Sequence, residues 1–100
     1  MKVHWTDTAD GHLDAIYAHI AQDSSEYAKR IIDRLTRRSQ QIAEFPFSGR
    51  KVPEYDVEQI REVIEGSFRI IYRIKSEQID ILAVINGAMD VLGRSEQEDE

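Results

Sequence analysis

Three arginines lie on consecutive segments that alternate like β-strands, and arginine side chains can bind phosphate or carboxylate groups. Arg61 falls on one such segment, and Arg69 and Arg73 fall on the next. A planar guanidinium can hold either group through two parallel hydrogen bonds. The alternative is that the arginines form ion pairs within the sheet, because Glu62 and Glu65 could meet them across a hairpin. The three arginines are therefore candidates for a partner-binding patch or for structural ion pairs.

A second group of cations lies in the middle of the chain. Seven lysines and arginines occur between residues 29 and 51, whereas residues 3–26 hold five acidic residues and no lysine or arginine. This asymmetry indicates one basic and one acidic surface. Candidates for contacts with an acidic partner are Arg34, Arg37, Arg50 and Lys51, and the alternative is a solvated helix face. The net charge of −6 and the pI near 5.0 differ from those of dedicated nucleic-acid-binding domains, so we expect no direct sequence-specific nucleic-acid binding.

The residue types of a metal site or a catalytic centre do not come together in the sequence. The chain has no cysteine, which excludes thiolate ligands and disulfides. His12 and His19 would lie about 10.5 Å apart along a helix, too far to share a metal, and we expect both to face solvent. Glu62 and Glu65 are interpreted as charges on the sheet surface. We therefore predict no metal site, no cofactor and no catalytic residue.

The spacing of apolar residues predicts two helices in the first half of the chain. Apolar side chains within residues 13–20 recur on one helical face. Asp7 or Thr8 is expected to cap this helix, and Asp23 or Ser24 to cap the next one, because their side-chain oxygens accept from free backbone N–H groups. The second helix should end before Pro46. Since only a few residues join the two helices, we expect an antiparallel hairpin.

The second half of the chain predicts three strands joined by tight turns, at about residues 60–64, 68–75 and 79–85. Val3 and Trp5 fit a short strand ahead of the first helix, and residues 45–55 form an irregular connection. The predicted fold class is α+β, with an N-terminal helical hairpin packed on a small, largely antiparallel four-stranded sheet in the order β-α-α-β-β-β. The predicted core between hairpin and sheet includes Leu13, Ile16, Ile31, Leu35, Phe68, Ile70 and Ile81.

The length and composition favour a single domain that spans residues 1–94. Residues 95–100 form an acidic tail that we expect to be disordered. No apolar run approaches the roughly 20 residues of a membrane span, and the N-terminus has no signal-peptide core. We therefore expect a cytoplasmic protein without a membrane partner.

Three short motifs occur in a fixed order, namely PFSGR at residues 46–50, RE at residues 61–62 and FRIIY at residues 68–72. In this order and spacing they resemble the ParE/RelE superfamily of toxins from type II toxin–antitoxin systems. The resemblance runs from about Val3 to Asp90, and weaker parts of it lie near Trp5 and in the ILAVINGAMD segment. The fold of this family, a helical hairpin packed on a largely antiparallel sheet, agrees with the pattern described above.

The resemblance implies one of two activities. RelE-like members cleave mRNA on the ribosome without a metal, which requires groups that activate a 2′-hydroxyl and protonate the leaving oxygen. ParE-like members poison DNA gyrase and lack the full cleavage set. Many cleaving relatives carry a histidine closely followed by an arginine after the last strand, where this chain has Asn86 and Met89. Tyr72 alternates with core residues and is interpreted as a packing residue, so the ParE-like activity is favoured.

The ParE-like interpretation implies a toxin that inhibits DNA gyrase and that a cognate antitoxin neutralises in a hetero-oligomer. One alternative is a ribosome-dependent mRNA endoribonuclease of the RelE type. Another is an inert protein with the toxin fold that acts only in complex with its antitoxin. For contacts with the target we favour Arg61 and Arg69, followed by the segment that begins at Asn86 and includes Met89.

Overall fold

The structure is a computed structural model that describes residues 1–87 of the 100-residue chain. Met89 and the acidic tail of residues 95–100 lie outside the described residues, so the predictions made for them stay predictions. The elements follow the predicted order, with one additional short strand. They are β1 (Lys2–Trp5), α1 (Asp7–Ala21), α2 (Ser25–Glu44), the 3-10 helix η1 (Pro46–Ser48), β2 (Arg50–Lys51), β3 (Ile60–Glu65), β4 (Phe68–Ile74) and β5 (Gln78–Asn86).

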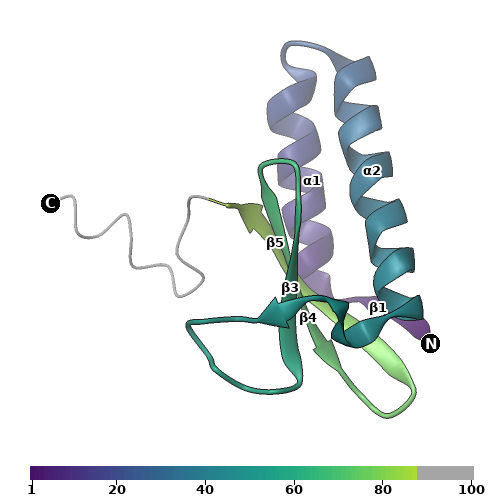
Figure 1. Ribbon diagram of the computed structural model, residues 1–100. Coiled ribbons are helices and arrows are strands. Elements are labelled where there is room, and N and C mark those ends of the chain that lie inside the picture. Colours follow the sequence, from purple (N-terminus) through teal and green to yellow (C-terminus); the bar gives the residue numbers. More distant parts are fainter. Residues whose placement is uncertain (88–100) are drawn as a thin grey trace, which may run out of the picture.

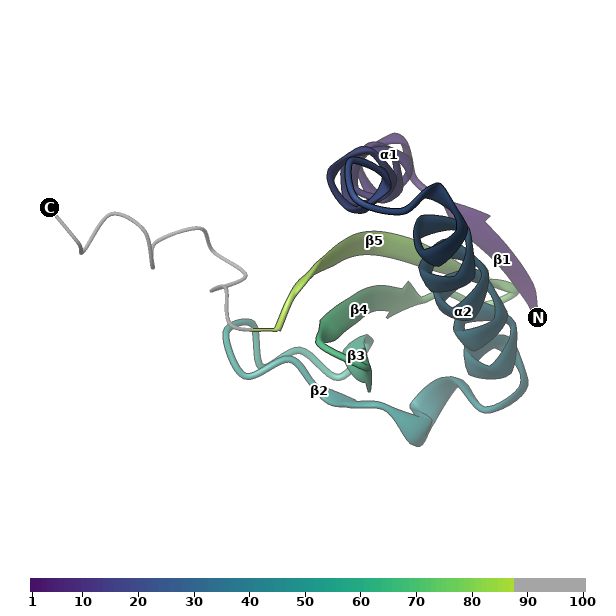
Figure 2. The ribbon, with the colours of Figure 1, turned by 90° about the horizontal axis from the view of Figure 1, so that it is seen from above.

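The two helices lie side by side and antiparallel against one face of a curved sheet (Figure 1). The strands follow the order β1-β5-β4-β3-β2, in which β1 pairs parallel with β5 and the other neighbours pair antiparallel. Viewed from above, β2 lies at the edge of the sheet farthest from α1 (Figure 2). The predicted α+β architecture is confirmed, but the sheet has five strands in place of four.

The additional strand β2 is too short for side-chain alternation to reveal it. Its two residues pair antiparallel with Arg61 and Glu62 of β3. Gly49 permits this approach, because a Cβ at that position would lie 2.5 Å from the carbonyl oxygen of Glu62 and 2.6 Å from the hydroxyl of Tyr72. The absence of a side chain therefore lets the chain turn from η1 into the edge of the sheet.

The helix boundaries follow from two capping residues. Thr6 caps α1 in place of the predicted Asp7 or Thr8, since its Oγ1 accepts from the Ala9 N–H at 3.2 Å and donates to the Ile81 carbonyl at 2.8 Å. Ser24 caps α2 as predicted, with its Oγ accepting from the Tyr27 N–H at 3.1 Å. Within residues 1–87, no helix is both long and apolar enough to cross a membrane.

The main core lies between the hairpin and the sheet, as predicted. Leu35 is 1% exposed and packs in one cluster with Ile70 and Ile81, both fully buried. The other apolar side chains expected there are buried or packed against the cluster as partly buried residues, namely Leu13, Ile16, Ile31 and Phe68.

A β-bulge lets β5 contribute to both faces of the sheet. Ile71 pairs with Ala83 but Tyr72 pairs with Ile81, so Leu82 has no counterpart on β4. An extra residue at this point shifts the alternation by one position. Ile81 and Val84 therefore both join the main core, while Leu82 and Ala83 pack on the outer face, the sheet face turned away from the helices.

His12 is part of the fold, and the prediction that it faces solvent is wrong. Its Nδ1 accepts a hydrogen bond from the Val84 N–H at 3.1 Å. The register of β1 ends with Trp5 opposite Ile81, so the strand does not reach Val84. A buried donor without a partner would be costly, and His12 supplies the acceptor from α1. His19, by contrast, is exposed.

The burial of Leu35 yields a first prediction. Leu35→Ala should lower the free energy of unfolding by about 2–5 kcal/mol, because the substitution removes packed methyl groups and leaves a cavity. Ile64→Ala is the control, since Ile64 lies on β3 with an exposed side chain, and should change stability by less than about 0.5 kcal/mol. Urea unfolding monitored by circular dichroism measures both. Equal stability of the two variants would contradict the assignment of Leu35 to the core.

Candidate partner-binding surfaces

The three strand arginines do not form one patch. Arg61 lies opposite Tyr72 in the β3–β4 register, and the Tyr72 side chain belongs to the main core, so Arg61 lies on the helix-covered side. Arg69 and Arg73 alternate with Tyr72 along β4 and lie on the outer face. Of the two alternatives left open for these arginines, one patch shared by all three does not form, because the register of the hairpin places Arg61 on the opposite side of the sheet.

Arg69 is a buried member of an ion-pair network. Its Nε and Nη2 lie 2.7 and 2.6 Å from Oε1 of Glu62, and its Nη2 lies 3.1 Å from Oε1 of Glu54. The Arg69 side chain is 8% exposed and that of Glu62 is 0% exposed. Burial opposes the charged form of Arg69, but the hydrogen bonds and charges of Glu54 and Glu62 outweigh it and raise the pKa of Arg69.

Glu62 is consequently not a surface charge, and that prediction is wrong. Its second oxygen, Oε2, accepts from Nε of the largely exposed Arg50 on β2. The network thus joins β2, β3 and β4 with Glu54 of the β2–β3 connection. It lies on the same face as a small second core of Val52, Ile60 and Ile71. The ion pair that the sequence left open for Arg69 is present, although spacing alone could not point to Glu54.

Arg61 holds the segment between α2 and β2. Its Nη1 donates to the Gly49 carbonyl at 3.0 Å, and its Nε and Nη2 contact the carbonyl and the carboxylate of Glu58 at 2.9 and 2.6 Å. Its guanidinium also lies 5.0 Å from the centre of the Phe47 ring, a cation–π contact. The guanidinium of Arg61 is therefore engaged by groups of the same chain.

Tyr72 is buried as predicted, and its hydroxyl also has a structural role that the alternation did not reveal. The hydroxyl donates to the Pro46 carbonyl at 2.6 Å and accepts from the Gly49 N–H at 3.2 Å. Burial raises the pKa of Tyr72, although the hydrogen bond from Gly49 opposes this. The hydroxyl is therefore neutral near pH 7 and fixes both ends of η1.

The basic residues of α2 lie on a solvent-exposed surface. Arg34 contacts Glu65 at 3.1 Å, Arg37 contacts Asp33 at 3.0 Å, and the Arg37 side chain is 68% exposed. Together with Arg38 and Gln41, Arg34, Arg37 and Glu65 line a hollow of about 210 Å³. The remaining candidates are distributed elsewhere: Lys51 contacts Asp56 at 3.3 Å, and Arg73 and Asn86 are exposed.

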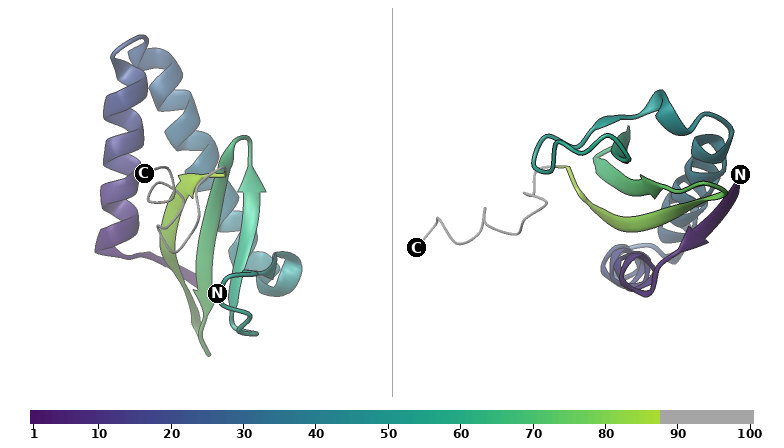
Figure 3. Two further views of the ribbon diagram at one scale, coloured as in Figure 1. Left: turned by 90° about the vertical axis from the view of Figure 1, so that its left-hand side faces the viewer. Right: turned by 90° about the horizontal axis from the view of Figure 1, so that it is seen from below.

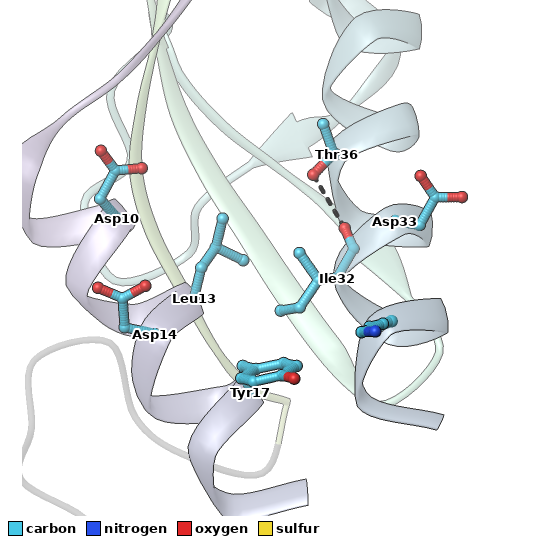
Figure 4. A pocket seen from close by; sticks show the side chains of 8 residues that line it. Asp10, Leu13, Asp14, Tyr17, Ile32, Asp33 and Thr36 are labelled. Carbon is cyan, nitrogen blue, oxygen red and sulfur yellow. Dashed lines mark hydrogen bonds between the residues drawn. The ribbon is translucent and has the colours of Figure 1, made fainter. Parts of the chain in front are cut away.

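The opposite side of the hairpin carries the predicted acidic surface. Figure 4 shows Leu13, Tyr17 and Ile32 facing one another between α1 and α2, in a groove of about 590 Å³. Its rim carries three aspartates, Asp10, Asp14 and Asp33, together with Lys29. Asp10 and Asp14 come from the acidic part of the sequence, whereas Lys29 and Asp33 come from the basic part, and Asp33 also pairs with Arg37.

Sequence analysis missed two exposed aromatic residues. Phe45 and Phe47 are 66% and 56% exposed and flank Pro46 where α2 ends. The sequence predicts only an irregular connection for residues 45–55. This position lies outside both the helical and the strand periodicity, so neither pattern could reveal the exposure of the two rings.

Comparisons with known proteins agree with this arrangement. The model of one protein family, described as "ParE toxin of type II toxin-antitoxin system, parDE", matches residues 3–91. The chain belongs to the ParE toxin family. It is 32% identical over 87 residues to a protein of Sinorhizobium fredii (strain NBRC 101917 / NGR234) named "Putative toxin Y4kP", a match that covers 85% of this chain and 86% of that protein.

A solved ParE-related structure shares the fold. It is described as "Chromosomal ParDE TA system from P. aeruginosa", and it superposes with a TM-score of 0.72 at 26% identity. The match covers 86% of this chain and 95% of that chain. The hairpin-on-sheet architecture described above is therefore the architecture of a solved member of a ParDE system.

The ion-pair network of Arg69, a residue of the FRIIY motif, yields a second prediction. Arg69→Ala should lower the free energy of unfolding by about 3–5 kcal/mol, because it leaves the carboxylate of Glu62 buried with one partner fewer. Arg73→Ala is the matched control, an exposed arginine on the same strand and face, and should cost less than about 0.5 kcal/mol. Urea unfolding measures both variants.

The double variant Glu62→Leu with Arg69→Met separates charge from packing. It should regain much of the stability lost in Arg69→Ala, since no charge is then left buried without its main partner. If Arg69→Ala is as stable as Arg73→Ala, the network does not hold the outer face together.

Proposed function

We propose that this chain is a ParE-type toxin that inhibits DNA gyrase by binding and that a cognate antitoxin holds inactive. Family membership supports the toxin assignment. The observation that favours gyrase inhibition over RNA cleavage is the state of Tyr72, the residue of the strand motifs best suited to proton transfer. Its hydroxyl is buried and engaged with Pro46 and Gly49, so it is not available to a substrate.

The last residue of β5, Asn86, supports the same proposal. Many RNA-cleaving relatives, according to the family resemblance, carry a histidine near the position of Asn86. An amide neither donates nor accepts a proton near neutral pH, so it cannot replace an imidazole in general acid–base catalysis. Inhibition by binding requires only a complementary surface, and the chain offers several exposed charged and aromatic side chains for one.

An antitoxin partner is supported by the ParDE description of the structural relative. Antitoxin segments of this kind are expected to be disordered when free and to fold on the toxin, as an amphipathic helix or an added strand. We propose that the basic surface of α2, with Arg34 and Arg37, steers an acidic antitoxin segment toward the toxin.

The decisive experiment compares two targets with one preparation. Purified toxin should inhibit supercoiling by DNA gyrase and raise the yield of gyrase–DNA cleavage complexes in proportion to its concentration. Relaxation by topoisomerase I, the control enzyme, should not change. The same preparation should leave mRNA intact in a ribosome-dependent cleavage assay. Cleaved mRNA with unaffected gyrase would replace this proposal with the endoribonuclease. If the preparation neither inhibits gyrase nor cleaves mRNA, the result favours a protein that acts only in complex with its antitoxin.

The steering proposal has its own test. Arg34→Glu with Arg37→Glu should slow association with the antitoxin encoded beside this chain and flatten the salt dependence of the association rate. Lys2→Glu with Arg73→Glu makes the same change in net charge at two exposed positions elsewhere. Stopped-flow measurements at low and high salt compare the two variants. Association as fast as that of the wild type at low salt would exclude steering by this surface.

A further inference from the structure

The two most exposed large apolar side chains of residues 1–87 are separated by a single residue in the chain. Phe45 is 66% exposed and Phe47 is 56% exposed, on either side of Pro46. Isolated apolar residues on a surface are ordinary. Two phenylalanines that project from one short segment offer a partner far more apolar area than either would alone. We call residues 45–49 the anchor loop.

The anchor loop is held from several directions. The Tyr72 hydroxyl, reaching out from the core, binds Pro46 and Gly49, and the Arg61 guanidinium binds the Gly49 carbonyl. Within the loop, the Ser48 N–H donates to the Phe45 carbonyl at 2.9 Å. Gly49 lies so close to β3 that a Cβ would collide with the Glu62 backbone. Figure 3 shows this segment as a compact turn that leaves the end of α2 and enters β2.

Such fixation has an energetic meaning for binding. A side chain carried by a rigid backbone loses less conformational freedom on association than one on a flexible loop. Aromatic residues that project in this way are the usual anchors of protein interfaces. The fold therefore uses a buried hydroxyl, an arginine and a glycine to present two apolar rings to solvent.

The charged side chains around the anchor loop indicate which charges a partner would carry around its binding site. Arg50 follows the loop directly with a largely exposed side chain, Lys51 comes next and is also exposed, and Arg38 lines a hollow of about 440 Å³ beside Phe45. Acidic side chains lie there as well: Glu44 lines the same hollow, Glu58 contacts Arg61, and Asp56 contacts Lys51. A complementary partner would therefore carry charged side chains of both signs around its apolar cleft.

We propose that Phe45 and Phe47 are a rigid anchor that inserts into an apolar cleft, rimmed by charged side chains of both signs, on the folded protein that the toxin inhibits. This inference rests on the proposed function. Two projecting rings need a preformed cleft, which a folded target has and a short antitoxin segment does not. Stacking on nucleic-acid bases is disfavoured, because the Arg61 guanidinium already covers one face of the Phe47 ring.

The test uses a double variant, Phe45→Ser with Phe47→Ser, in the full chain. The control is Tyr27→Ser with Ile64→Ser, which removes two other exposed apolar side chains. Both variants should keep the wild-type midpoint of urea unfolding, and the single variants replace the double one if it does not. The anchor variant should need at least about tenfold more protein for half-inhibition of gyrase and of growth, because anchor residues dominate binding energy. Its affinity for the antitoxin should equal that of the control.

Each other outcome has a defined meaning. If the wild type inhibits gyrase and the anchor variant inhibits it equally, the inference is wrong and the proposed function stands. If the wild type does not inhibit gyrase, the proposed function fails. The inference then stands if the anchor variant inhibits growth less than the control variant does, and it is wrong if the two inhibit growth equally. Loss of antitoxin affinity would assign the loop to the antitoxin. Binding of labelled oligo-dT or oligo-U by the wild type but not by the variant would assign it to nucleic acid. Either result would overturn the proposal.

Discussion

The carboxylate of Glu62, buried between two guanidiniums, is the interaction on which the outer half of this protein depends. The helices cover only one face of the sheet, and the second core on the other face is small. Arg69 and Arg50 approach the carboxylate from β4 and β2, and Glu54 adds the β2–β3 connection. A buried ion pair is costly to desolvate and costly to break. The Glu62 network can form only when three strands and one connection are in register at the same time, and it therefore specifies their arrangement.

The three sequence motifs of the family are parts of one set of contacts. Gly49 and Arg50 come from the first motif, Arg61 and Glu62 from the second, and Arg69 and Tyr72 from the third. Tyr72 and Arg61 bind Gly49, and Glu62 binds both Arg50 and Arg69. Residues that identify the family therefore build the framework.

Much of the fold could be predicted because its main signals are local. The periods of the helices and of β3, β4 and β5 located those elements, and the faces of Phe68, Ile70 and Tyr72 followed from alternation. Features that depend on distant partners could not be predicted. The parallel pairing of β1 with β5, the bond from Val84 to His12 and the contact of Glu54 with Arg69 join positions that no local pattern relates.

The candidate site illustrates the same limit. Composition and spacing identified the basic residues of α2 and the arginines of the strands. Whether an arginine faces a partner or a buried glutamate depends on register, and a single residue of shift reverses its side of the sheet. Arg69 and Arg73 are four positions apart on one strand and lie on one face, yet one is buried in a network and the other is exposed.

The pairing of β1 with β5 also determines when the sheet can be completed during synthesis. Lys2 lies opposite Gln78 and Trp5 opposite Ile81, and Thr6 binds the Ile81 carbonyl. The residues of β1 thus receive their partners only after nearly the whole domain has been synthesised. Contacts between such distant positions form late in folding. A nascent chain is therefore without its complete sheet until β5 has been translated.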